Sequence, residues 1–118
     1  MKVLVLIVIG LLVLGCLTPE QKLRDSVIGE YEFTDEDGEI YKGVFLDNGI
    51  VEEHENGHKL EERKWTIVNG EIQVDDGSKK TAVLSIKKDR SITRIGYIFE
   101  GKRTVYSKKD QWTFKKIK

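Results

Sequence analysis

Cysteine and proline are almost absent from this chain of 118 residues, which contains one of each. A single cysteine cannot form a disulfide within the chain, so the fold depends on its core alone. No proline- or serine-rich linker interrupts the sequence, and we therefore expect a single folded domain.

Signatures of catalysis are missing as well. No serine lies in a Gly-x-Ser-x-Gly turn, and no glycine-rich loop of the phosphate-binding type occurs. The carboxylates alternate along polar segments, where nothing predicts the burial or crowding that raises a pKa. We therefore expect neither an enzyme nor a cofactor, and we assign no catalytic residue.

Histidine is scarce, and its two copies flank one turn. His54 and His58 lie on either side of Asn56-Gly57, among several glutamates. A two-residue loop would pair Glu55 with His58 and place His54 on the other face, whereas a three-residue loop would pair the two histidines directly. A solvated polar hairpin is favoured over a metal site here, and we assign no metal ligand.

An excess of either charge is also lacking, because 20 basic residues balance 20 acidic ones. This balance gives no support for nucleic-acid binding. The distribution is uneven: residues 20–76 hold seventeen acidic and six basic side chains, and residues 77–118 hold three acidic and thirteen basic. Acidic strands pairing with basic strands would explain this pattern. The alternative is a surface dipole whose basic end faces anionic lipid headgroups.

What the sequence does contain is an apolar start. Lys2 precedes twelve uncharged residues from Val3 to Leu14, and Gly15 and Cys16 follow. The run is short for a membrane-spanning helix, which needs about 20 apolar residues. A charged start, a short apolar stretch and small residues before a cleavage site are typical of an export signal, predicted here for residues 1–15.

The tetrad Val13-Leu14-Gly15-Cys16 resembles the lipobox of bacterial lipoproteins. The resemblance implies cleavage after Gly15 and diacylation of the Cys16 thiol. Two acyl chains suffice for stable anchoring, whereas one binds a membrane only marginally. We therefore expect an exported, lipid-anchored protein of the cell envelope. In a host with two membranes the family rule points to the outer one, because Leu17 is not an aspartate.

A short helix is predicted within residues 16–28, after the modified cysteine. Thr18 can cap it, Pro19 suits its first turn and Gln21 completes a capping box. Leu23 and Val27 would share one face, four residues apart. Gly29 is then predicted to end the helix.

Residues 29–118 alternate between strand patterns and tight turns. Turns are predicted at Asp37-Gly38, Asn48-Gly49, Asn56-Gly57, Asn69-Gly70, Asp76-Gly77, residues 89–91 and Glu100-Gly101, which leaves nine candidate strands. Such short connections permit only antiparallel neighbours. We therefore predict an all-β antiparallel meander that closes as a small barrel or half-barrel, since closure removes exposed edges.

A short helix followed by Gly29-Glu30-Tyr31 and an antiparallel meander resembles a reduced lipocalin. The whole chain is similar to small bacterial lipoproteins that carry a lipocalin-like β domain. The resemblance implies a barrel that binds a small apolar ligand at its centre.

Alternation predicts that seven aromatic side chains face the interior: Tyr31, Phe33, Trp65, Tyr97, Phe99, Trp112 and Phe114. They would either fill the core or line a ligand pocket. The first alternative favours a non-catalytic envelope module that acts by binding or structural contact with an unidentified partner. The second favours a lipocalin-like carrier of a small apolar molecule.

Overall fold

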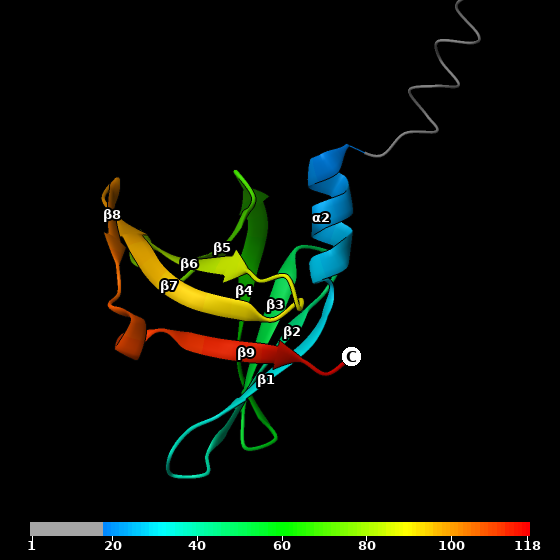
Figure 1. Cartoon of the computed structure of the whole chain (residues 1–118), viewed down its shortest axis with the longest axis vertical. Coiled ribbons are helices and arrows are strands. Elements are labelled where there is room, and N and C mark those ends of the chain that lie inside the picture. Colours follow the sequence, from blue (N-terminus) through cyan, green and yellow to red (C-terminus); the bar gives the residue numbers. More distant parts are fainter. Residues whose placement is uncertain (1–17) are drawn as a thin grey trace, which may run out of the picture.

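The computed structural model describes residues 18–118, so the predicted signal and Cys16 lie outside the described range. One helix and nine strands follow one another (Figure 1). Their bounds are α2 Pro19–Val27, β1 Gly29–Thr34, β2 Ile40–Phe45, β3 Ile50–Glu55, β4 His58–Val68, β5 Glu71–Asp75, β6 Lys80–Ile86, β7 Ile92–Phe99, β8 Lys102–Val105 and β9 Trp112–Lys116, with a short 3-10 turn η1 at Lys108–Asp110. The predicted all-β class with a short N-terminal helix is confirmed.

The strands form a closed antiparallel barrel. Each of β1 to β7 pairs with the next strand, and β9 pairs with both β1 and β7. Eight strands therefore complete the ring. Strand β8 lies outside it, paired only with the second half of β7 from Gly96 to Phe99. In Figure 1, β8 rises beside the barrel at the far end of β7.

Helix α2 begins as the sequence predicts. The Thr18 hydroxyl accepts a hydrogen bond from the Gln21 amide, and the Gln21 side chain accepts one from the Thr18 amide. Its end differs, because Ile28 is the C-terminal cap. Gly29 has φ +148°, and a Cβ there would lie 2.3 Å from the Lys118 carbonyl oxygen. Glycine is thus needed for close approach to the C-terminal segment.

Asparagine–glycine turns set the hairpin registers. Asn56 and Gly57 both have positive φ, at 50° and 84°, the requirement of a two-residue hairpin loop. Glu55 consequently pairs with His58, and His54 pairs with Lys59. The two histidines therefore do not lie opposite each other, which is the arrangement predicted for a two-residue loop.

The helix end of the barrel is tightly packed. Val27 is buried, and its carbonyl accepts a 2.7 Å hydrogen bond from the buried Tyr31 hydroxyl. Tyr31, Phe45 and Trp65 meet edge-to-face, with successive ring centroids 5.4 Å apart. The Trp65 indole N–H donates to the Leu46 carbonyl. These contacts close this end of the barrel, and we call it the closed end.

The pairing of acidic with basic strands accounts for only part of the uneven charge distribution. On β1, Glu32 lies opposite Lys115 of β9, so acidic and basic strands do pair there. On β3 and β4, by contrast, Glu52 lies opposite Glu62 and Glu53 opposite Glu61. The β3–β4 hairpin is therefore an acidic region, held by cations that lie between its carboxylates.

Candidate functional site

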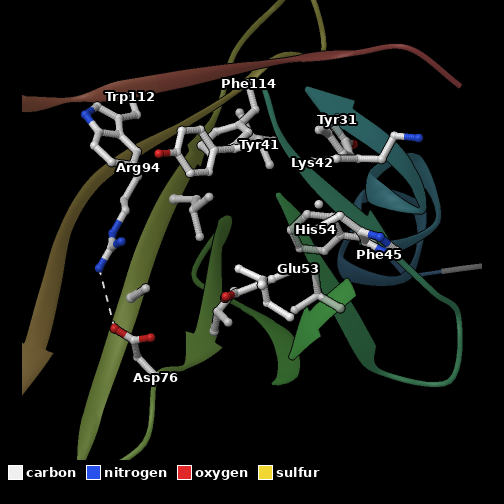
Figure 2. A pocket seen from close by; sticks show the side chains of 17 residues that line it. Tyr31, Tyr41, Lys42, Phe45, Glu53, His54, Asp76, Arg94, Trp112 and Phe114 are labelled. Atoms are coloured by element: carbon white, nitrogen blue, oxygen red, sulfur yellow. Dashed lines mark hydrogen bonds and ion pairs between the residues drawn. The ribbon is translucent and has the colours of Figure 1, made fainter. Parts of the chain in front are cut away.

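A cavity of about 180 Å³ occupies the barrel interior away from the helix (Figure 2). Its floor consists of buried side chains, nearly all apolar: Tyr31, Phe45, Val51, Val74, Ala82, Leu84 and Ile92. Its rim consists of more exposed ones, including Tyr41, Glu53, Leu60, Asp76, Arg94 and Trp112. Lys42, Gly43, His54 and Phe114 also border it. The cavity thus has an apolar floor and a polar, aromatic opening.

Small residues at inward positions leave this space. Gly43 lies on β2 opposite Tyr31 and Glu53, and both of these border the cavity. A Cβ at Gly43 would make ordinary contacts, 3.5 Å from the Phe45 ring and 4.0 Å from Val51. The glycine is therefore not required by the backbone, and its missing side chain accounts for part of the volume. The small side chain of Ala82 on β6 leaves space in the same cavity.

One side of the rim is aromatic. The Phe33 and Trp112 rings stack with centroids 5.4 Å apart and planes 11° apart. Tyr41 lies 6.3 Å from Phe33 and 5.9 Å from Trp112. Trp112 remains 43% exposed although it faces the opening. Strands β1, β2 and β9 thus present flat, accessible ring surfaces at the mouth.

The other side of the rim is charged. Arg63 lies opposite buried Val51, so it points inward. Its Nε donates to Glu53 at 2.8 Å, one Nη contacts Glu61, and the other lies 3.4 Å from an Asp76 oxygen. Burial lowers the pKa of Arg63, but these three carboxylates more than offset it and leave the pKa raised. Arg63 therefore ties β3, β4 and the β5–β6 turn together.

Arg94 is the second cation on this side, and it is less well paired. It lies opposite Leu84 and Trp112, which both border the cavity. Its Nη2 is 3.5 Å from Asp76, the arginine's one ion pair in the described chain. Its Nε is buried and has no hydrogen-bond partner among residues 18–118. Figure 2 shows the guanidinium reaching toward Asp76 along the cavity wall.

Two other polar rim groups are already engaged. The Tyr41 hydroxyl donates to Glu39 at 2.9 Å, and this bond raises the pKa of Tyr41 to about 12. His54 lies 3.2 Å from Glu52, and the hydrogen bond between them lowers the pKa of Glu52. Neither group is arranged as an acid–base pair over the cavity floor.

The structure separates the seven predicted interior aromatics into groups. Tyr31, Phe114 and Trp112 border the cavity, and Phe33 stacks against Trp112 at the mouth. Trp65 is absent from the cavity wall and packs at the closed end instead.

Tyr97 and Phe99, which were also predicted to face the interior, do not border this cavity. Both lie on the half of β7 that pairs with β6 on one side and with β8, instead of β9, on the other. There Tyr97 contacts Tyr106 with ring centroids 5.8 Å apart, and Phe99 is 44% exposed. Alternation gives the face of a strand, but it does not show where the opposite wall of a barrel ends.

Arg94 was missed because a β-bulge interrupts the alternation. Val83 pairs with Gly96 while Leu84 pairs with Arg94, so one extra residue, Ile95, lies between them on β7. Arg94 and Tyr97 therefore share a face despite their odd spacing. Gly96 was the available signal, because glycine inside a strand often marks a bulge or close backbone approach. A Cβ there would lie 2.0 Å from the Thr104 carbonyl oxygen.

Comparison of the chain with protein-family models, with curated proteins and with solved structures finds no significant match. Within residues 18–118 no group of three or more His, Cys, Asp or Glu side chains is placed to hold a metal ion. That range also contains no helix long and apolar enough to cross a membrane. The interpretation of the cavity therefore rests on its own geometry.

Proposed function

We propose that this chain is a lipid-anchored protein of the cell envelope that acts without catalysis, by holding a small apolar ligand in its barrel. The observation that carries the proposal is the cavity, which combines a buried apolar floor with an accessible rim. Such a pocket, with a few polar groups near its opening, is the usual form of a small-molecule site.

The volume limits the size of the ligand. Pockets for drug-sized molecules span about 300–1,000 Å³. At about 180 Å³ this cavity is smaller. A cavity of about 150 Å³ lined by Leu, Ile and Phe holds benzene. The proposed ligand therefore places a group of about one ring on the floor, and a wide lipocalin cup for a large lipid is not supported.

The direction of the opening suits an anchor that precedes the helix. Tyr41 at the start of β2 lies on the rim, whereas Phe45 at its end lies beside Trp65 at the closed end. Helix α2 is at the closed end, where Arg24 donates to the Asp47 carbonyl. A lipid on Cys16 would therefore hold the closed end toward the membrane and leave the mouth facing away from it.

The cavity is tested with the full chain in lipid nanodiscs, by titrating 3-phenylpropanol and recording tryptophan fluorescence against ligand-treated empty nanodiscs. We expect saturable binding. Gly43→Leu should abolish it, because the new side chain enters the cavity without a backbone clash. Val44→Leu is the matched control, since its pairing with Glu30 and Glu52 places it on the outer face. Absence of saturation in the wild type, or equal binding by both variants, refutes the proposal.

The anchor is tested separately by expressing the chain in a bacterium. We expect a mature mass that corresponds to cleavage after Gly15 and a diacylglyceryl group on Cys16. Cys16→Ser should lose that mass and leave the membrane fraction. A variant that stays bound to the membrane with an unaltered mass argues against lipid anchoring.

A further inference from the structure

The geometry points to a carboxylate on the ligand: we infer that the barrel binds a small monocarboxylate whose apolar body lies on the floor and whose anionic group is held by Arg94. This inference rests on the proposed function and adds the chemical class of the ligand. It is carried by the placement of one incompletely paired arginine beside an apolar cavity.

The first step is the hydrogen-bonding capacity of Arg94. A guanidinium carries five N–H donors in a planar fork. In the described chain Arg94 makes one ion pair, at 3.5 Å, and its buried Nε has no acceptor. A buried donor without a partner is costly and calls for an acceptor at that place. A carboxylate is the group that takes two parallel N–H bonds from such a fork.

The second step concerns Asp76, which would compete for Arg94. Its carboxylate lies between two guanidiniums, 3.4 Å from Arg63 and 3.5 Å from Arg94. Both distances exceed the 2.7–2.9 Å typical of charge-assisted hydrogen bonds. Arg63 would remain beside Asp76 if Arg94 turned toward a ligand. The displaced contact is therefore a weak one, and Asp76 keeps a counter-ion.

The third step is the position of Arg94 relative to the apolar surfaces. It faces Leu84 on one neighbouring strand and Trp112 on the other. The floor lies on the Leu84 side and the stacked aromatic rim on the Trp112 side. A ligand ring on the floor thus brings a short side chain past Arg94 at the mouth. This arrangement fits 3-phenylpropionate and comparable acids.

The alternative to be excluded is a cationic ligand. The inward charged set contains three carboxylates (Glu53, Glu61 and Asp76) and two arginines, Arg63 and Arg94. A cationic ligand would have to use Asp76 or Glu53. Glu53 already receives a 2.8 Å bond from Arg63, whereas the unused donor belongs to Arg94. The geometry therefore favours an anion over a cation.

Three ligands with the same body separate these cases: 3-phenylpropionate, 3-phenylpropanol and 3-phenylpropylamine, measured at pH 7 with the full chain in zwitterionic nanodiscs. We expect the carboxylate to bind roughly 10- to 100-fold more tightly than the alcohol, the range for hydrogen bonds to charged groups. Equal affinity, or preference for the amine, overturns the carboxylate assignment but leaves the apolar site standing. If none of the three saturates, the proposed function itself fails.

Variants assign the effect to Arg94. Arg94→Gln should reduce carboxylate affinity to that of the alcohol and leave alcohol affinity unchanged. Arg94→Lys keeps the charge without the fork and should give an intermediate loss. Arg103→Gln is the control, because Arg103 pairs with Glu71 outside the cavity wall and should change neither affinity. Parallel loss of both ligands in Arg94→Gln and Arg94→Lys, or none in either, contradicts the inference.

Discussion

The two ends of the barrel use the same residue types in opposite ways. At the closed end Tyr31, Phe45 and Trp65 meet edge-to-face and are almost fully buried. At the open rim Phe33 and Trp112 lie nearly parallel, and Trp112 keeps 43% of its surface exposed. Edge-to-face contacts interlock neighbouring rings, whereas parallel rings leave a flat face free. The comparison separates aromatic residues that stabilise the fold from those available for recognition.

The largest expected difference between the ends is in the two tryptophans. Trp65→Ala should lower the free energy of unfolding by roughly 3–5 kcal/mol, because it removes a buried ring and leaves a cavity. Trp112→Ala should cost less, about 1–2 kcal/mol, since 43% of its surface is already exposed and removing it leaves no enclosed cavity. Urea unfolding followed by circular dichroism measures both. Equal losses would mean that the rim is part of the stabilising core.

A smaller difference is expected in the tyrosine hydroxyls. Tyr31→Phe removes the donor to the buried Val27 carbonyl and should cost about 1–3 kcal/mol. Burial also raises the pKa of Tyr31 to about 12, so this hydroxyl stays protonated and able to donate at neutral pH. Tyr41→Phe at the rim removes an exposed bond to Glu39 and should cost about 0.5 kcal/mol or less. Thermal unfolding at pH 7 tests the pair, and a reversed order would contradict the assignment of the two ends.

The smallest expected effect is a local response of the open end to acid. The hydrogen bond to His54 lowers the pKa of Glu52 below its ordinary 4.5. A lowered pKa means that the ionised form stabilises the fold above 4.5 and that this contribution disappears as the pH falls through the lowered value. Amide protection factors, which correct for the intrinsic pH dependence of exchange, should therefore fall on β3 and β4 below pH 4.5, before those on β5. Glu52→Gln should remove this pH dependence, and its persistence would place the effect elsewhere.

Local chemistry in the sequence predicted much of the fold. Asn56-Gly57 fixed the pairing of Glu55 with His58, and the capping residues placed the start of α2. Both depend on neighbouring residues only. The site was less predictable, because Arg94 faces inward only through the bulge at Ile95. The cavity depends on Gly43, whose inward position matters only once the opposite strands are in place.

The exposure of the rim could not be predicted for a related reason. Trp65 and Trp112 occupy similar alternating patterns, and both were expected to face inward. Both do lie on inward faces, but one is 4% exposed and the other 43%. Periodicity specifies the face of a strand, whereas depth along the barrel depends on how strands are staggered.

The seam of the barrel has a consequence for the order in which the chain can fold. Tyr31 and Glu32 of the first strand pair with Lys116 and Lys115 of the last. The ring therefore cannot close until nearly the whole sequence is available, while the hairpins from β1 to β7 join neighbours and can form earlier. Contacts between distant parts of a chain form slowly, because the entropic cost of closing the loop comes before the contacts stabilise it. A chain synthesised from its N-terminus onward would remain an open, curled sheet until β9 has been made.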